Sequence, residues 1–218
     1  MPFDCGNQKT DEPSESRIAP GFGQLWPLGN DGFGVGYRSP PTCGTVHWKN
    51  SMRRIFLDTE FTQFRDGQLL SLGLVTDDGH EFYVEIADSA RHARASDFCR
   101  DEVISQFGLL PGTAVRDDAS AGARLANWLD SFEYPLAISY DYKLDWRFFE
   151  GALRAAGQWQ ALASKLRAED VAGVAAPGTP GEAAQNALFD ASNLPRRHHA
   201  LVDARALRAA WQASSMQG

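Results

Sequence analysis

Three short apolar segments follow one another after residue 52, and their spacing constrains the fold more than any other feature. RRIFLD at 53–58, LLSLGLVT at 69–76 and HEFYVEI at 80–86 each have the length and composition of a strand. The tetrapeptide TDDG between the second and third is typical of a hairpin turn. The sequence therefore predicts three neighbouring strands in a meander.

The remaining apolar patterns add helices and one more clear strand. PLAISY at 135–140 predicts a strand, and 158–180 is expected to be loop with at most one short strand. Helical spacing or capping residues predict helices at 95–108, 120–132, 144–157, 181–192 and 194–214. Strands followed by alternating helix and strand predict an α/β domain, with a mixed central sheet of about five strands flanked by helices.

The first 51 residues differ in composition from the rest of the chain. They contain 8 of the 20 glycines and 6 of the 11 prolines, and they lack sustained strand or helix periodicity. We expect residues 1–51 to form a loop-rich or disordered extension, 52–214 to form the folded domain, and 215–218 to be a tail. An alternative interpretation is that translation begins at Met52; the intact mass of the native protein would test it.

Composition narrows the class of protein. The 218-residue chain is 43% hydrophobic and 22% charged, which suits one water-soluble domain with some additional length. An apolar stretch long enough to cross a membrane is absent from the sequence, and the three cysteines do not have disulfide or zinc spacing. We expect a cytoplasmic protein. The net charge of −7 argues weakly against non-specific nucleic-acid binding, although bound cations can reverse the local sign.

Two carboxylates stand at the end of the first predicted strand. Asp58 and Glu60 follow the apolar run and are separated by Thr59. Residues two apart in a strand share a face, so both carboxylates are expected to point to one spot, where like charges repel. Exposure to water at the protein surface is one explanation of this pair. A hard divalent cation between the two carboxylates is the other.

Further acids follow other predicted elements. YDYKLDWRFF places Asp141 and Asp145 directly after the strand at 135–140. A helix-capping or first-turn role is the structural alternative for Asp145. HHALVDA, in the last predicted helix, carries His198 and Asp203, and Asp203 lies at the edge of an apolar face, where an acid is unusual unless it has a partner.

Four carboxylates and one imidazole, each at the end of a predicted element, suit a two-metal site. Two Mg²⁺ ions about 4 Å apart bind the attacking and leaving oxygens of a phosphoryl displacement. Mg²⁺ prefers the oxygen ligands that Asp and Glu supply. A histidine can accept the proton of the attacking water at neutral pH. The sequence therefore predicts a two-metal site for in-line phosphoryl displacement by water.

Over about 53–213 the chain resembles the DEDDh branch of the 3′-to-5′ exonucleases, which have a ribonuclease H-like fold. Asp58-Thr59-Glu60 matches the Asp-x-Glu motif of that family, and His198 with Asp203 matches its His-x-x-x-x-Asp motif. Asp145 matches the second motif, in which the residue four positions earlier is usually Asn. Here that residue is Asp141, which departs from the family and leaves Asp141 as an alternative ligand.

The resemblance implies roles for these residues and a cofactor. Asp58 is expected to bridge two Mg²⁺ ions, for which Mn²⁺ can substitute; Glu60 and Asp203 complete the tighter site, Asp145 supports the second, and His198 is the general base. The tyrosine branch of the family would need Tyr at position 199. On an ideal helix His199 is offset by about 100° from His198, so a solvent-facing or supporting role is expected for it.

The resemblance also implies a substrate. The chain is similar to small bacterial 3′-to-5′ exoribonucleases, so we expect it to bind the 3′ end of single-stranded RNA, and a homodimer is a further expectation. A proofreading or repair 3′-to-5′ DNA exonuclease, an endonuclease of the same fold, and a non-catalytic binding module are the alternatives. Phe61 and Phe64 are expected to stack on terminal bases, or to pack in the core. Arg196, Arg197, Lys143 and Arg147 are candidates for phosphate contacts, or for a solvated face.

Overall fold

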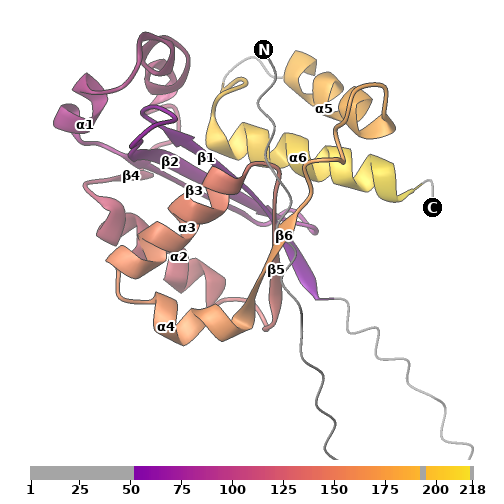
Figure 1. The fold of residues 1–218 in the computed structure, drawn as a ribbon, viewed down its shortest axis with the longest axis horizontal. Coiled ribbons are helices and arrows are strands. Elements are labelled where there is room, and N and C mark those ends of the chain that lie inside the picture. The colour runs from indigo at the N-terminus through magenta and orange to yellow at the C-terminus, as the bar shows by residue number, and fades with distance from the viewer. Residues whose placement is uncertain (1–51, 192–194, 217–218) are drawn as a thin grey trace, which may run out of the picture. The chain divides into compact units, whose positions relative to one another are not determined.

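The computed structural model describes residues 52–191 and 195–216, and everything below refers to this part of the chain (Figure 1). The expected N-terminal extension at 1–51, and the question of a start at Met52, lie outside it.

The described residues form a six-stranded mixed sheet with the order β4-β3-β2-β1-β5-β6. Neighbours β1, β2 and β3 are antiparallel, whereas β5 is parallel to β1 and to β6, and β4 is parallel to β3. The predicted α/β class and mixed sheet are confirmed, with six strands instead of about five. The strands are Arg53–Phe61 (β1), Leu69–Thr76 (β2), Glu81–Ile86 (β3), Ala114–Val115 (β4), Leu136–Tyr140 (β5) and Leu166–Asp170 (β6).

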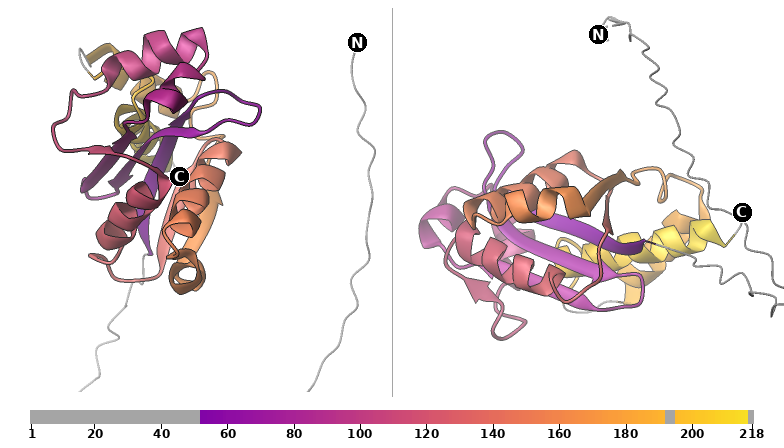
Figure 2. Two further views of the ribbon diagram at one scale, coloured as in Figure 1. Left: turned by 90° about the vertical axis from the view of Figure 1, so that its left-hand side faces the viewer. Right: turned by 90° about the horizontal axis from the view of Figure 1, so that it is seen from below.

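Helices cover both faces of the sheet (Figures 1 and 2). They are Ser89–Ala93 (α1), Asp118–Leu129 (α2), Lys143–Ala155 (α3), Trp159–Leu162 (α4), Pro180–Ala191 (α5) and Ala200–Ser215 (α6). A π-helical turn, Cys99–Val103 (η1), and two short 3₁₀ turns, Ile104–Gln106 (η2) and Ala163–Lys165 (η3), complete the ordered elements. None of the described helices is both long enough and apolar enough to span a membrane.

The alternation of β1 sends its side chains into two separate cores. Ile55 and Leu57 are fully buried on the face covered by α2 and α3, together with Leu125 and Phe149 from those helices. Phe56 points to the opposite face, where α6 packs on the sheet and α5 packs on α6. Because side chains alternate along a strand, Asp58 and Glu60 share the α6 face with Phe56.

Several element boundaries differ from those the sequence predicts. β1 continues to Phe61, so the two acids lie within the strand and not after it. α2 begins before residue 120 because the carboxylate of Asp117 accepts a hydrogen bond from the amide of Ser120 (2.8 Å). α3 stops at Ala155, and Gly157 follows with the positive φ of 71° that suits a glycine after a helix.

Two helix predictions need larger corrections. The segment 95–108 is not one helix but the η1 and η2 turns, which are shorter and irregular. The last helix begins at Ala200, not at 194, because His198 has a positive φ of 66° that breaks a right-handed helix. His198 therefore lies on a turn before α6, and helical geometry does not separate it from His199.

Candidate functional site

The two acids of β1 lie where the strand meets the first turn of α6. Asp58 is paired across the ladder with Gly73, and Glu60 with Ser71, both on β2. The ladder shifts register between Glu60 and Phe61, as it does in a β-bulge. Such irregularities occur frequently beside functional sites because they redirect side chains at a strand end.

Gly73 allows α6 to approach the sheet at this point. A Cβ atom on Gly73 would lie 2.4 Å from the backbone of Ala200 and Leu201, closer than non-bonded atoms can come. Glycine in the interior of a strand weakens it, and often marks a place where another backbone approaches closely. Here the approach brings the start of α6, and with it Asp203, over the strand pair that carries Asp58.

Asp145 reaches the same place from α3. The parallel pairing of β1 with β5 ends at Phe56 and Ser139, so the backbone of β1 beyond that point has no strand partner on this side. The carboxylate of Asp145 accepts hydrogen bonds there from the amide (3.2 Å) and hydroxyl (2.7 Å) of Thr59. Asp145 is 2% exposed, and its carboxylate binds β1 instead of capping its own helix.

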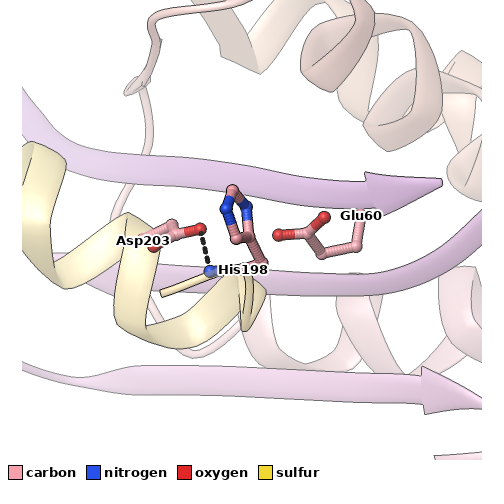
Figure 3. A group of neighbouring side chains, drawn as sticks. All are labelled: Glu60, His198 and Asp203. Carbon is pink, nitrogen blue, oxygen red and sulfur yellow. Dashed lines mark hydrogen bonds between the residues drawn. The ribbon is translucent and has the colours of Figure 1, made fainter. Parts of the chain in front are cut away.

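His198 and Asp203 are joined through the backbone. The amide of His198 donates a hydrogen bond to Oδ2 of Asp203 (2.9 Å), which closes the turn before α6. Figure 3 shows the imidazole between the carboxylates of Asp203 and Glu60. A nitrogen of the ring lies within 4.8 Å of carboxylate oxygens of both residues. The five residues predicted from three separate segments are thus brought together.

The carboxylates form two groups, each with ligand atoms within 4.8 Å of one another. One contains Glu60, His198 and Asp203, and the other contains Asp58, Asp141 and Asp145. The choice that the sequence left open between Asp141 and Asp145 is not exclusive, because both side chains lie beside Asp58. Asp145 is buried and Asp141 is exposed, so the former is the more tightly positioned of the two.

Burial and mutual repulsion make these acids unusually weak. Burial, followed by the nearby charges of Asp203 and Asp145, raises the pKa of both Asp58 and Glu60 well above the ordinary range. Burial also raises the pKa of Asp145, and that of Asp203, from 3.8 to about 7. Among the described residues, these acids have no ion pair with a lysine or arginine.

Two carboxylate oxygens in the cluster are buried and have no hydrogen-bond partner within the part of the chain that the structure describes. They are Oδ2 of Asp58 and Oδ1 of Asp203. Nearly all buried polar atoms in folded proteins are hydrogen-bonded, so an unpaired carboxylate oxygen calls for a partner from outside the chain. Oxygen ligands with partial negative charge suit a hard divalent cation, and the residues present therefore fit one.

The two neighbouring histidines have different surroundings. Burial and the charge of Arg197 lower the pKa of His198, which favours the neutral imidazole that can accept a proton. Of the two roles expected for His199, the solvent-facing one is wrong and the supporting one remains, since His199 is 2% exposed and stacks on Tyr83 with ring centroids 4.3 Å apart. Burial lowers the pKa of His199 to about 4. His199 thus anchors the turn to β3.

An apolar cavity of about 570 Å³ opens directly beside His198 and Glu60. Phe61 and Phe64 line it, together with Phe98. Phe61 is partly buried and stacks on Phe148, whereas Phe64 is 77% exposed and meets Phe61 edge to face. The core-packing alternative therefore fits Phe61 in part and does not fit Phe64. We call this space the aromatic cavity.

The predicted phosphate-binding residues are less closely associated with the cluster. Lys143, at the start of α3, is exposed. Arg197 is exposed and holds its guanidinium over the ring of Phe189 (5.0 Å), and its positive charge partly offsets the rise that burial causes in the pKa of Asp203. Arg147 lines a smaller cavity of about 170 Å³ on the other side of Phe64. Arg196 is paired with Glu102 (2.9 Å).

Sequence reasoning missed four residues that shape the site. Phe98 packs edge to face against the ring of His198 at 5.0 Å, but its segment was expected to be an ordinary helix. The sequence marks Thr59 only as the residue between two acids, and it gives no signal for Gln106. Gly73 carried a detectable signal, since it is the one glycine within an otherwise apolar strand pattern.

Comparisons with known proteins do not assign a family to the chain. The chain matches no protein-family model. A search of curated proteins also finds no significant match.

Proposed function

We propose that this protein is a metal-dependent 3′-to-5′ exoribonuclease of the DEDDh type, with a ribonuclease H-like fold. The observation that carries the proposal is the convergence of Asp58, Glu60, Asp145, His198 and Asp203 on one spot. These residues come from β1, α3 and the start of α6, and their order along the chain is that of the DEDDh motifs. The mixed sheet with antiparallel β1-β2-β3 and parallel β5 is consistent with the proposed fold.

The acidic cluster would hold two Mg²⁺ ions, with Mn²⁺ able to replace them. Asp58, Asp141 and Asp145 supply one set of ligands, and Glu60 with Asp203 supplies another. The unpaired buried oxygens of Asp58 and Asp203 support this assignment. When bound, the cations supply positive charge that offsets the charge on the reacting phosphate and lowers the pKa of water.

Three further side chains have separate roles in the proposed hydrolysis. The neutral imidazole of His198 lies beside Glu60 and Asp203 and accepts a proton from the attacking water. Thr59 holds Asp145 against β1 through two hydrogen bonds, which keeps that carboxylate from rotating away. The ring of Phe98 limits the motion of the imidazole from the side of the aromatic cavity.

The aromatic cavity supports a single-stranded nucleic-acid end as the substrate. Bases stack on aromatic rings irrespective of sequence, and the exposed ring of Phe64 offers such a surface. The cavity adjoins His198 and Glu60, so a terminal base bound there would place its phosphodiester near the carboxylates. Arg147 and Lys143 lie on the α3 side of the site and are candidates for contacts to phosphates further along the strand.

The experiment compares RNA and DNA oligonucleotides of the same sequence, each labelled at the 5′ end. A 3′-to-5′ exoribonuclease shortens the RNA in single-nucleotide steps when Mg²⁺ or Mn²⁺ is present. Chelation by EDTA stops the reaction, and a 3′-phosphate in place of the 3′-hydroxyl slows it. Hydrolysis that persists in EDTA would overturn the metal-dependent mechanism.

The same experiment separates the alternative functions. Faster shortening of DNA than of RNA would indicate a DNA exonuclease. Products that arise from internal positions would indicate an endonuclease. Binding of the oligonucleotide without hydrolysis under all metal conditions would indicate a binding module and would overturn the proposed enzyme.

A further inference from the structure

Gln106 is a buried polar side chain that the hydrolytic residues do not account for. It lies at the end of the η2 turn and is 1% exposed. Its amide nitrogen donates to the backbone carbonyls of Glu102 (2.7 Å) and Arg197 (3.0 Å). Its amide oxygen accepts from the backbone amide of Arg196 (2.7 Å). Both donors and the acceptor are thereby used.

The backbone that Gln106 binds leads directly into His198. One side-chain amide thus contacts the N–H of Arg196 and the C=O of Arg197, two consecutive residues of the turn. Beyond Arg197 the chain enters the left-handed conformation of His198, which is uncommon for a residue with a side chain. The turn is thus held by Gln106 on one side and by the bond from the amide of His198 to Asp203 on the other.

From these contacts we infer that Gln106 is a positioning residue for the imidazole of His198. Gln106 keeps the 196–198 backbone fixed so that the ring stays between Glu60 and Asp203. This inference rests on the proposed function, in which His198 takes the proton of the attacking water. Gln106 does not reach the acidic cluster itself, so its effect passes through the turn.

A second contact to the same turn provides the matched control. The side chain of Glu102 pairs with the guanidinium of Arg196 at 2.9 Å, and both side chains are more than two-fifths exposed. This ion pair connects the same two segments through mobile side chains in water, where such pairs contribute little. The connection through the buried amide of Gln106 fixes backbone atoms. The two contacts are therefore expected to differ sharply in their effect on the site.

The test measures kcat and KM on a single-stranded RNA for four single variants and two double variants. Gln106→Glu keeps the size of the side chain but places a carboxylate against two carbonyl oxygens, and Gln106→Met removes all three hydrogen bonds. We expect each to lower kcat on the order of 10²-fold, the cost of a misplaced general base, with KM within about twofold. Glu102→Gln is expected to leave kcat within about twofold.

Combination with His198→Ala separates positioning from general loss of structure. If Gln106 acts through the imidazole, Gln106→Glu or Gln106→Met costs less than about twofold when His198 is already alanine. An equal loss of kcat with and without His198 would overturn the inference. An unchanged kcat in a folded Gln106→Met protein would overturn it as well. Gln106→Met serves in place of Gln106→Glu if the carboxylate prevents folding.

Histidine NMR tests the positioning without any measurement of activity. Ring signals of His198, assigned by their loss in His198→Ala, are recorded at about pH 8, above the titration of an imidazole. They should shift or broaden in Gln106→Met and stay close to their wild-type positions in Glu102→Gln, because the charge of Glu102 acts on His198 only through its pKa. The exposed His80 serves as the internal reference. If wild-type protein hydrolyses no nucleic acid, the proposed function fails, but these signals still decide whether Gln106 positions His198. Unshifted His198 signals in Gln106→Met would overturn the inference.

Discussion

The two halves of β1 differ in whether the charged side chains on the α6 face have partners of opposite charge. In the first half, Arg54 points to the α6 face and donates to Glu169 (2.7 Å), and it also lies over the ring of Trp211 (4.2 Å). In the second half, Asp58 and Glu60 point to the same face without a basic partner among the described residues. The intervening Phe56 is fully buried.

On the α6 face, the charged residue in the first half of β1 stabilises the fold, whereas the charged residues in the second half destabilise it. Charge near Arg54 is neutralised within the chain, so that half holds β1, β5 and β6 together. Charge near Asp58 has no such compensation, and burial makes each carboxylate weaker as an acid. A chain that keeps several uncompensated acids in one place loses stability there, which is the pattern expected of a functional site.

The largest expected effect comes from the acidic half. Asp58→Asn keeps the shape of the side chain but removes a ligand and one negative charge. Hydrolysis of RNA should fall by at least about 10³-fold, while the melting temperature in EDTA should rise because repulsion is relieved. Calorimetry and the oligonucleotide assay check both, with the exposed Asp190→Asn as control. If Asp58→Asn keeps its activity, the uncompensated acids of β1 have no catalytic role, and the proposed difference between the two halves is wrong.

A somewhat smaller effect is expected where α6 meets the acids. Gly73→Ala places a methyl group against the backbone of Ala200 and Leu201, so α6 must shift and carry Asp203 and His198 with it. Activity should fall roughly 10²-fold, and stability should fall by about 1–3 kcal/mol. Gly151→Ala is the matched control, because nothing lies within 4 Å of a Cβ at that position in α3. Equal behaviour of the two variants would contradict the close packing of α6.

The stability of the protein should also depend on pH, because the buried acids of the site have raised pKa values. In cation-free protein the pKa values of Asp145 and Asp203 are about 7 instead of 3.8, so the folded state binds protons that the unfolded state releases. The resulting stability is fully present below pH 3.8 and is lost as the pH rises through about 7. Divalent cations compete with these protons, so they should stabilise the protein more at high pH than at low pH.

Thermal melts in EDTA and in Mn²⁺, at about pH 5.5 and about pH 8, check this expectation. The rise in melting temperature caused by Mn²⁺ should be clearly larger at the higher pH and should shrink in Asp58→Asn. An equal rise at both values would mean that the carboxylates are not the cation ligands.

The smallest effect on activity is expected from the paired half of β1. Glu169→Gln removes the charge that Arg54 binds, and because the pair is only partly buried the loss should be about 1–2 kcal/mol of stability. Activity should stay within about twofold of wild type, because Arg54 precedes Asp58 by four residues and does not touch the acids. Urea denaturation and the RNA assay measure the two quantities. A large loss of activity would show that the two halves of β1 are not independent.

Much of the sheet could be predicted from the sequence, because its central strands are apolar and β-rich. β1, β2, β3 and β5 were all expected, as were helices close to α2, α3 and α5. β4 has only two residues, which is too short for any period to be detected. β6 is the one short strand that the sequence allows for at 158–180, but its polar sequence LRAED does not reveal its position, because alternating burial is weak at the edge of the sheet. These strands therefore depend on tertiary contacts that the local sequence does not reveal.

The acids of the site were predictable because Asp58 and Glu60 share one face of a predicted strand, and because Asp145 and Asp203 match the remaining motifs of the family that the chain resembles. Their supporting residues were not predictable. Asp141 and Asp145 lie in one short segment, and only the fold shows that both reach Asp58. Gln106 and Phe98 are ordinary residues whose role depends on a turn distant in sequence. The positive φ of His198 also left no signal, since histidine rarely adopts it.

Asp203 uses its two oxygens for different purposes. Oδ2 accepts a hydrogen bond from the amide of His198 (2.9 Å), whereas Oδ1 is buried and has no partner at 52–191 or 195–216. The amide hydrogen of His198 can exchange with solvent only when that bond opens, so its exchange rate measures the free energy of opening the turn. A cation held by Oδ1 would tether Asp203 and slow this exchange. Amide exchange at one position thus reports on both the closure of the turn and the occupancy of the acidic cluster.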